Sequence, residues 1–230
     1  MRYRAGSPDA RQERAYEHPD VTGLVRDLVA QPDIRLVKLA AKASLIRTVP
    51  TPDEFYSLIT PALYWDDYLG SVAQRVAQHA LNIGTAVARE DRVRRRGAFL
   101  ERLVFELVAS REPGRTYREQ EVQLDRAPRS GRAWTRPKEV LADAATFELY
   151  ECKADGLVDV GDIDELSDVM TTATAEHTDA RPTVVVLDSE LALRVHAVAW
   201  RLTETIYGVT TERILGLREE APSRPIRPAA

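Results

Sequence analysis

The sequence has little of what disulfides, zinc sites and membrane spans require. One cysteine, Cys152, excludes an internal disulfide bond and fits a reducing cytoplasm. Four scattered histidines beside a single cysteine argue against a structural zinc site. No segment approaches the roughly 18 consecutive apolar residues that a membrane span needs. Residues 1–19 are polar and charged, so we expect no secretory signal, no membrane association and a cytoplasmic protein.

Lysine is also scarce. Lysine and arginine together number 32, and only four are lysines, namely Lys38, Lys42, Lys138 and Lys153. The two residue types are not equivalent, because lysine is a compact point charge whose pKa moves readily while arginine stays protonated. Lys153 therefore draws attention as the last residue of the tripeptide Glu151-Cys152-Lys153.

What the chain does contain is typical of a soluble globular protein, with 44% hydrophobic and 30% charged residues. Its charge is unevenly distributed. Residues 89–138 hold 14 basic and 8 acidic side chains, whereas residues 139–190 hold 14 acidic side chains and two basic ones. A basic half that can hold phosphates thus precedes an acidic half that can hold divalent cations. The alternative is two ordinary solvated surfaces of opposite sign.

The sequence pattern divides the chain into four segments. The composition of residues 1–19 and 219–230 predicts disorder. Residues 20–96 are predicted to be all helical, with a helix start at Thr51, where Thr51 and Glu54 form a capping box around Pro52. The remaining segment, 97–218, begins with a helix and then changes to strand periodicity.

The order of elements after residue 97 predicts an α/β fold. The expected elements are a helix at 97–109, strands at 120–124, 138–143 and 147–153, a helix at 162–175, a strand at 183–187, a helix at 190–202 and a strand at 205–209. The first three strands are expected to be antiparallel. The apolar run at 183–187 is typical of a central strand buried on both faces.

The tripeptide that ends the third strand is the main candidate for chemistry. Side chains alternate along a strand, so Glu151 and Lys153 emerge on one face and Cys152 on the other. Both charges are poor core residues, because burying either one unpaired is costly. A site that holds a metal ion and an activated water would use both the carboxylate and the ammonium group. This pair of side chains therefore points to phosphodiester hydrolysis. The alternative is a surface ion pair, which contributes little energetically.

Three segments, in this order, resemble the PD-(D/E)XK (restriction-endonuclease-like) nuclease superfamily: Gly97–Glu101, Pro137–Asp143 and Leu149–Lys153. The resemblance covers roughly residues 97–209. It implies a restriction-endonuclease-like core and a metal-dependent endonuclease that acts on DNA rather than RNA, with Mg²⁺ or Mn²⁺ as cofactor. In that family the glutamate of Glu-x-Lys and an acid of the second strand bind the metal. The lysine orients the attacking water, and a glutamate of the leading helix supports the metal shell.

Carried onto this sequence, the resemblance makes Glu151 a catalytic residue and metal ligand and Lys153 a catalytic residue, with Glu101 as a further metal ligand. The second strand offers two acids. If the turn centres on Ala145, Glu139 or Val140 falls opposite Glu151, so hairpin geometry favours Glu139. The family's usual aspartate favours Asp143, which shares strand parity with Glu139 and needs a longer or bulged turn. We prefer Asp143 as catalytic residue and metal ligand on chemical type, and we keep both. Glu101 has an alternative role as a structural partner of an arginine or a backbone amide.

Two arginine-rich stretches are candidates for contact with nucleic acid. The first lies in the run before the leading helix and the second in the loop before the second strand, with a tryptophan that can stack on a base: Arg94, Arg95, Arg96, Arg129, Arg132, Trp134 and Arg136. The alternatives are a solvated face for the first stretch and a partly buried, anchoring Trp134 for the second.

Two functions of different class follow from the sequence. The first is the metal-dependent nuclease, whose helical segment 20–96 serves recognition, regulation or assembly of a homodimer. The second is a non-catalytic scaffold that binds nucleic acid or protein and retains the nuclease-like fold. The unusual acid of the second strand and the net charge of −4 favour the scaffold.

Overall fold

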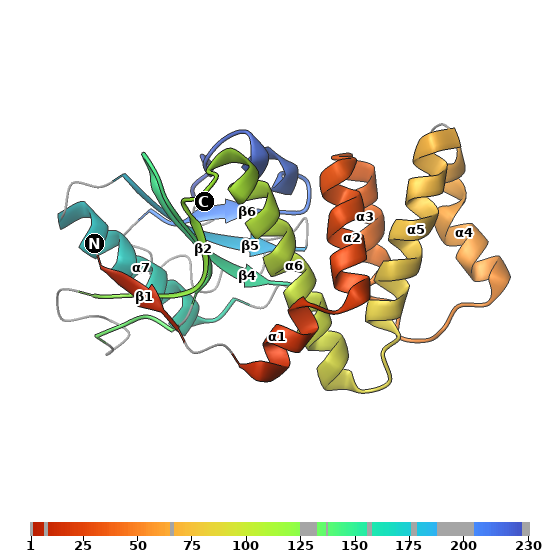
Figure 1. The fold of residues 1–230 in the computed structure, drawn as a ribbon, viewed down its shortest axis with the longest axis horizontal. Coiled ribbons are helices and arrows are strands. Elements are labelled where there is room, and N and C mark those ends of the chain that lie inside the picture. The colour runs from red at the N-terminus through yellow and green to blue at the C-terminus, as the bar shows by residue number, and fades with distance from the viewer. Residues whose placement is uncertain are drawn as a thin grey trace. The chain divides into compact units, whose positions relative to one another are not determined.

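The computed structural model describes residues 2–6, 9–64, 67–124, 133–136, 138–155, 158–175, 179–187 and 205–226. The chain divides into two compact units. One comprises Asp9–Leu103 and is called here the helical unit, and the other comprises Met1–Pro8 together with Val104–Ala230 and is called the sheet unit (Figure 1). Within the described part of the chain, every helix is too short or too polar to cross a membrane.

The helical unit contains α1 (Ala10–Tyr16), α2 (Pro19–Ala30), α3 (Ile34–Ala43), α4 (Pro52–Leu63), α5 (Asp67–Gly84) and the larger part of α6 (Arg89–Arg111). Side chains cap several helix starts. Asp9 accepts a hydrogen bond from the backbone N–H of Arg11 at 2.9 Å. The capping box expected at α4 is present, because Thr51 N donates to Glu54 Oε2 at 2.7 Å and Glu54 N donates to Thr51 Oγ1 at 3.3 Å.

Helix α5 is the centre of this unit, since α2, α3 and α4 all contact it. Its residues Val72, Val76 and Ala80 are buried, as are leucines of the neighbouring helices α2 and α3. At Gly84, the last residue of α5, the backbone of the segment that follows α3 comes very close. A Cβ atom on Gly84 would lie 2.4 Å from the carbonyl oxygen of Ile46, so only glycine fits there.

The sheet unit is built on a six-stranded sheet whose spatial order equals the sequence order. Its strands are β1 (Tyr3–Ala5), β2 (Thr116–Val122), β3 (Lys138–Asp143), β4 (Phe147–Lys153), β5 (Ala180–Val186) and β6 (Tyr207–Val209). The pairs β1–β2, β2–β3 and β3–β4 are antiparallel, whereas the pairs β4–β5 and β5–β6 are parallel. Helix α7 (Val160–Ala175) connects β4 to β5, and a 3₁₀ helix, η1 (Ile214–Arg218), follows β6.

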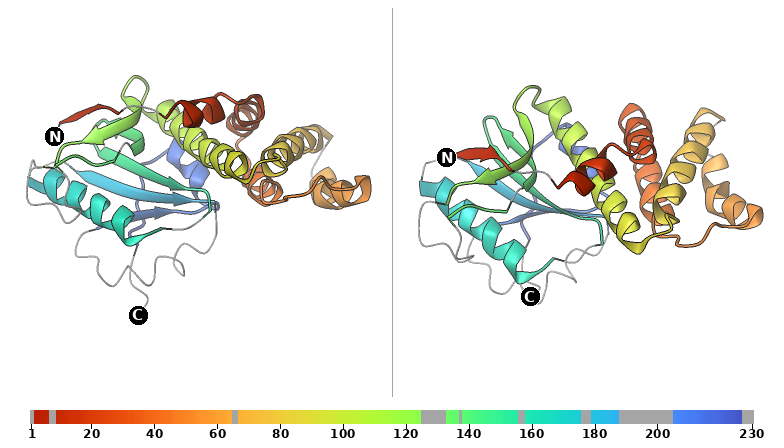
Figure 2. Two further views of the ribbon diagram at one scale, coloured as in Figure 1. Left: turned by 90° about the horizontal axis from the view of Figure 1, so that it is seen from below. Right: turned by 60° about the horizontal axis from the view of Figure 1, so that its bottom comes forward.

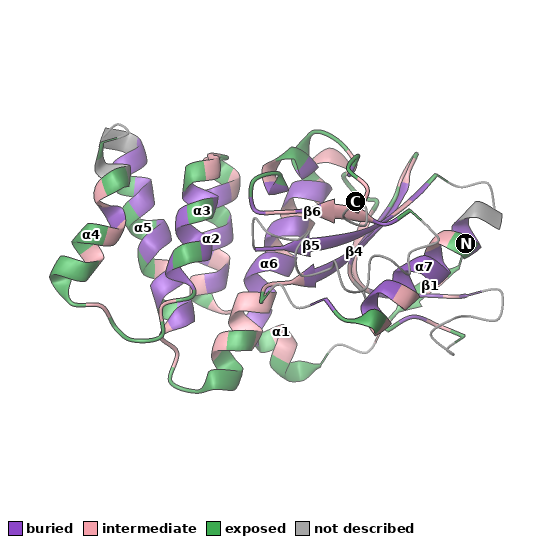
Figure 3. Cartoon of the chain, turned by 180° about the vertical axis from the view of Figure 1, so that it is seen from behind, coloured by how far each residue is buried: buried purple, intermediate pink, exposed green. Residues whose placement is uncertain are grey.

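Each face of this sheet is covered by a different element (Figure 2). On one face, Leu141 and Leu149 belong to a hydrophobic core shared with Leu166 and Val169 of α7. On the other face, Glu148 pairs with Arg111 at the C-terminal end of α6. Strand β4 is consequently buried along its whole length except for its last residue (Figure 3). The final residues of β4 therefore lie where the core ends.

The mixed α/β character expected from the sequence is confirmed, and β3 and β4 have the expected bounds. Strand β2 starts at Thr116, four residues earlier than expected. Helix α6 starts at Arg89 rather than at residue 97, because Glu90 and Asp91 in its first turn favour a helix N-terminus. The helix expected at 190–202 lies outside the described residues.

Parts of both termini that were expected to be disordered form regular contacts. Tyr3–Ala5 pairs with β2, and Ala10–Tyr16 forms α1, which buries Ala15 and Tyr16. Near the other end, Ile226 N donates to Ile206 O at 2.7 Å. Composition alone missed these contacts because the backbone, rather than an apolar run, supplies most of them. The helical unit accordingly runs from 9 to 103 rather than from 20 to 96.

Candidate active site at the end of strand β4

The register of β3 and β4 brings two glutamates together. Val140 pairs with Tyr150, so the next position along the ladder places Glu139 opposite Glu151. Directly opposed residues of an antiparallel pair share a face, and here it is the face that α7 covers. The backbone N–H of Cys152 donates to Glu139 Oε2 at 3.3 Å, which holds the Glu139 carboxylate beside the end of β4.

Lys153 completes this group. Its Nζ atom lies 2.8 Å from Glu151 Oε1 and 3.0 Å from Asp162 Oδ1. The two acceptors are buried, with residue exposures of 5% for Glu151 and 1% for Asp162. Lys153 itself is half-buried. An ammonium group between two buried carboxylates offsets their charge, which would otherwise be costly to bury.

This environment raises the pKa of Lys153. Burial acts to lower the pKa, but the negative charges and hydrogen bonds of Glu151 and Asp162 outweigh it. Lys153 is therefore protonated throughout the neutral range and cannot accept a proton from water.

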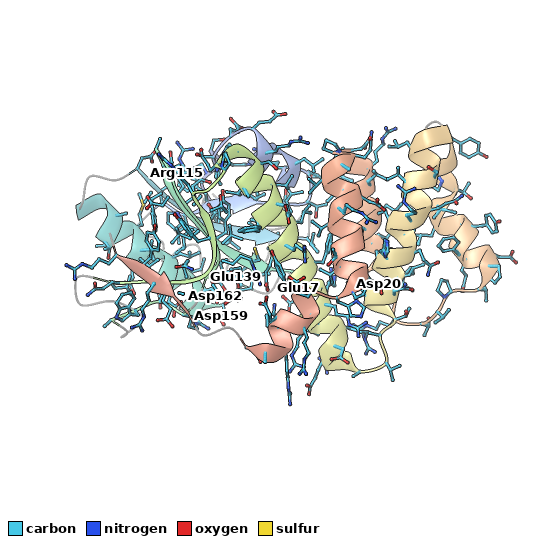
Figure 4. The ribbon with its side chains drawn as sticks, viewed as in Figure 1. Glu17, Asp20, Arg115, Glu139, Asp159 and Asp162 are labelled. Carbon is cyan, nitrogen blue, oxygen red and sulfur yellow. The ribbon has the colours of Figure 1, made fainter. Side chains whose placement is uncertain are left out.

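The first turn of α7 supports the same site. Asp159 and Asp162 cap each other's backbone, with Asp162 N donating to Asp159 Oδ1 at 2.9 Å and Asp159 N donating to Asp162 Oδ2 at 3.0 Å. Arg136 adds a second cation, since its Nε lies 3.1 Å from Glu165 Oε1 and its Nη2 lies 3.6 Å from Asp162 Oδ1. Figure 4 labels Glu139, Asp159 and Asp162 close to this turn.

A strained residue lies on β2 at the same level. The pairings of Arg118 with Val140 and of Gln120 with Lys138 place Glu119 opposite Glu139. Glu119 has a φ of 52°, the one positive value found for a residue other than glycine in the described part of the chain. Such backbone conformations cost free energy and cluster at functional sites. The strain therefore marks this end of the sheet independently of Glu151 and Lys153.

The preference for Asp143 in the second strand does not agree with this register. Asp143 pairs with Phe147 at the opposite end of the hairpin from Glu151. Its Oδ2 atom accepts a hydrogen bond from the hydroxyl of Tyr3 at 3.0 Å. The expectation required a longer or bulged turn, whereas the observed turn is tight, with Ala144 N donating to Thr146 O. Glu139, the alternative, is the acid that lies beside Glu151.

Glu101 belongs to the helical unit. Both of its carboxylate oxygens accept hydrogen bonds from Gln12 Nε2, at 2.8 and 3.0 Å. The structure thus gives Glu101 a side-chain amide as structural partner, rather than the arginine or backbone amide considered as the alternative. Its expected role as a metal ligand stays a prediction.

The expected nucleic-acid contacts fall in several places. Arg94 and Arg95 line one cavity of the helical unit, whereas Arg96 donates from Nε to Ser44 Oγ at 3.2 Å. Arg129 and Arg132 lie outside the described residues.

Trp134 and Arg136 lie in the sheet unit. Trp134 is partly buried, and the guanidinium carbon of Arg4 lies 4.2 Å from its ring centroid, so one ring face is covered. Among the members of the expected set that the structure describes, Arg136 reaches the β4 site.

Sequence reasoning missed Asp162 and Glu165 as members of the site. Asp162 was expected only as the first residue of a helix, whereas it lies in the first turn of α7, where its Oδ2 accepts the backbone N–H of Asp159. The signal that could have found Asp162 is its spacing of three residues from Asp159 at the start of an apolar helix. This helix is the first element after the Glu-x-Lys tripeptide. In an α/β unit such a helix begins close to the end of the strand that precedes it.

The site offers hard oxygen donors of the kind that Mg²⁺ or Mn²⁺ prefers. Mg²⁺ is commonly held by one or two carboxylates together with water and substrate phosphates, so Glu139 and Glu151 fit as donors. Across the described residues, no group of three or more His, Cys, Asp or Glu side chains is placed to hold a metal ion. In this structure the cation between Glu151 and Asp162 is the ammonium of Lys153.

No family model and no curated protein matches the sequence. Among solved structures, the chain is similar to protein VC1899 from Vibrio cholerae, with 16% sequence identity and a TM-score of 0.40. The match covers 94% of this chain and 56% of that chain, so this chain spans little more than half the length of VC1899. A TM-score of this size assigns neither a fold family nor a function.

Proposed function

We propose that the sheet unit is a divalent-metal-dependent nuclease with a restriction-endonuclease-like core, acting on DNA in preference to RNA. One observation carries the proposal. The register that pairs Val140 with Tyr150, continued by one position, sets Glu139 opposite Glu151, and Lys153 Nζ lies 2.8 Å from Glu151 Oε1 at the end of the strand. This is the arrangement that the Glu-x-Lys motif requires on an antiparallel pair.

The order of elements also supports a nuclease-like core. A leading helix is followed by three antiparallel strands, a helix and a parallel strand, in the sequence α6, β2, β3, β4, α7, β5. The expected site thus falls where β4 meets its parallel neighbour and α7 begins. Clefts at the carboxyl end of such strands are common places for ligands in α/β sheets.

The residues of the site have separable roles in this proposal. Glu139 and Glu151 would hold the metal ion, which would lower the pKa of a bound water and offset charge on the phosphate. Lys153, protonated at neutral pH, would stabilise negative charge on the attacking oxygen or on the phosphate. Asp162 would fix the position of the Lys153 ammonium.

A second candidate function has its own supporting observation. Lys153 already bridges Glu151 and Asp162, and Arg136 already pairs with Glu165, so internal cations occupy these carboxylates. A non-catalytic scaffold would keep such ion pairs for structure alone. It would bind nucleic acid or protein through other surfaces and would have no need of a metal ion.

Cleavage assays separate the two candidates. Purified protein would be incubated with supercoiled DNA, single-stranded DNA or RNA, in Mg²⁺, in Mn²⁺ or in a chelator. The nuclease proposal expects metal-dependent cleavage that falls by on the order of 10²-fold or more in Lys153→Ala and in Glu151→Gln. Lys42→Ala is the matched control, because Lys42 is an exposed lysine of α3. Cleavage that persists in both site variants, or no cleavage together with no Mn²⁺ binding, would favour the scaffold.

A further inference from the structure

The helical unit contains a groove that is rich in arginine. The groove lies between α1 and the first turns of α6 and has a volume of about 420 Å³. Its lining residues are Arg11, Arg14, Ala15, His18, Glu90, Asp91, Arg94 and Arg95. All of them belong to the same compact unit. The volume lies within the range of roughly 300–1,000 Å³ typical of small-ligand sites.

The arginines of this groove outnumber its carboxylates: Arg11, Arg14, Arg94 and Arg95 lie beside Glu90 and Asp91, which leaves a formal net charge of +2. Arg94 pairs with Glu90 at 3.3 Å. Within the described residues, no carboxylate forms an ion pair with Arg11, Arg14 or Arg95. The excess of guanidinium groups over carboxylates leaves net repulsion in the groove, and an anion that entered it would relieve this repulsion.

His18 adds a further polar group to the lining of the groove. Its Nδ1 atom accepts a hydrogen bond from Asp20 N at 3.3 Å, so the neutral ring carries its proton on Nε2. Burial, together with the positive charge of Arg95, lowers the pKa of His18, while the charges of Asp20 and Asp91 act in the opposite direction. The groove therefore offers arginine charges together with the imidazole ring of His18, whose pKa is lowered chiefly by burial.

We propose that this groove binds phosphate groups, carried either by a free nucleotide or by a nucleic-acid strand. Guanidinium groups match phosphate oxygens with paired hydrogen bonds, and arginine is the preferred residue for this recognition. The exposed Glu90 and Asp91 at the start of α6 exclude a uniformly basic surface and limit the number of phosphates bound. The proposal concerns the helical unit alone and does not rest on the nuclease activity.

Binding would be measured on the full chain in a chelator, so that no metal-dependent cleavage can interfere. The probes are inorganic pyrophosphate, adenosine triphosphate and a fluorescent single-stranded DNA of 12 nucleotides. Arg14→Ala and Arg95→Ala are each expected to weaken binding about tenfold, equivalent to ~1.4 kcal/mol. Arg26→Ala and Arg47→Ala are matched controls, because both arginines are exposed elsewhere in the same unit, and they are expected to change affinity less than twofold.

A gain in affinity provides a test that loss of folding cannot imitate. Asp91→Asn removes a negative charge from the groove and is expected to tighten binding several-fold. Binding of the DNA strand alone would identify the carrier of the phosphate groups as nucleic acid. Binding of adenosine triphosphate as tight as that of the DNA strand would identify the carrier as a free nucleotide. Absence of binding to any probe, or equal losses in the groove and control variants, would overturn the proposal. Unchanged melting temperatures verify that the variants are folded.

Discussion

The Nζ atom of Lys153 lies 3.0 Å from Oδ1 of Asp162, so the lysine of the Glu-x-Lys motif is held by the helix that follows it. Asp162 also accepts the backbone N–H of Asp159 through its other oxygen. One carboxylate therefore joins the start of α7 to the end of β4. The position of the Lys153 ammonium depends on α7 as well as on its own strand.

Replacing Asp162 with Asn would test this link. The substitution removes one of the two negative charges beside Lys153, so we expect the pKa of Lys153 to fall towards its ordinary value. We also expect unfolding free energy to fall by about 1–2 kcal/mol, from the weakened cap and a partly screened ion pair. Side-chain NMR of the lysine Nζ atoms is practical, because the chain has only four lysines. An unchanged titration of Lys153 would show that Asp162 does not hold it.

Stability at alkaline pH should report on the same ion pair. The pKa of Lys153 is raised in the folded protein, so its stabilising contribution is complete below the ordinary lysine pKa of about 10.4. The contribution is lost as the pH rises through the higher, folded-state value. The difference in unfolding free energy between wild type and Lys153→Met should thus be constant from about pH 6 to 9 and shrink above about pH 10.5. Denaturant unfolding of both proteins measures this difference in unfolding free energy. A difference that grows with pH would contradict the prediction.

The opposite face of β4 carries a buried charged group that is expected to be structural. Arg111 pairs with Glu148, which also accepts the hydroxyl of Tyr150, and Arg111 Nη1 donates to Leu217 O at 3.0 Å. Burial and the charge of Glu148 raise the pKa of Tyr150 well above its ordinary value. Arg111→Ala would leave a buried carboxylate unpaired, at a cost of about 3–5 kcal/mol in unfolding free energy.

The matched control for this variant is Arg115→Ala, because Arg115 is exposed in the turn that follows α6. It is expected to change unfolding free energy by less than about 0.5 kcal/mol. Denaturant unfolding compares the two variants. Equal, small effects in both would show that Arg111 is not a buried partner of Glu148.

Gly84 tests the packing of the helical unit. An added Cβ would lie 2.4 Å from Ile46 O and 2.8 Å from Ser44 O, and backbone atoms cannot yield as a flexible side chain can. Gly84→Ala is expected to cost about 2–3 kcal/mol or more in unfolding free energy. Gly97→Ala is the control, because its Cβ meets nothing closer than Glu101 Oε1 at 3.5 Å and it lies within α6. That change should be neutral or stabilising by up to about 1 kcal/mol, and calorimetry distinguishes the two.

Much of the fold was predictable because local signals determine it. The hydrophobic alternation and the tight turn gave the bounds of β3 and β4, and Thr51 with Glu54 gave the start of α4. The extra strand β1 was not predictable from composition. It forms because backbone groups at the edge of β2 accept a partner, and that edge exists only once the sheet has formed.

The candidate site was predictable in part. Sequence alternation placed Glu151 and Lys153 on one face, and they lie in contact. The choice of Asp143 over Glu139 followed the residue type usual in the resembling family, whereas hairpin geometry favoured Glu139, and the register agrees with the geometry. The role of Asp162 needed the position of α7 on the sheet, which no local pattern encodes.

The most direct measurement is the rate of metal-dependent cleavage of supercoiled DNA by wild type, Glu139→Gln and Asp143→Asn. These variants remove one charge each from the same strand, at opposite ends of the β3–β4 hairpin. We predict cleavage by the wild type, a loss on the order of 10²-fold or more in Glu139→Gln, and near wild-type rates in Asp143→Asn. Melting temperatures close to that of the wild type verify folding. Failure of the folded wild type to cleave, or equal rates in wild type and Glu139→Gln, would contradict a metal-dependent site at the end of β4.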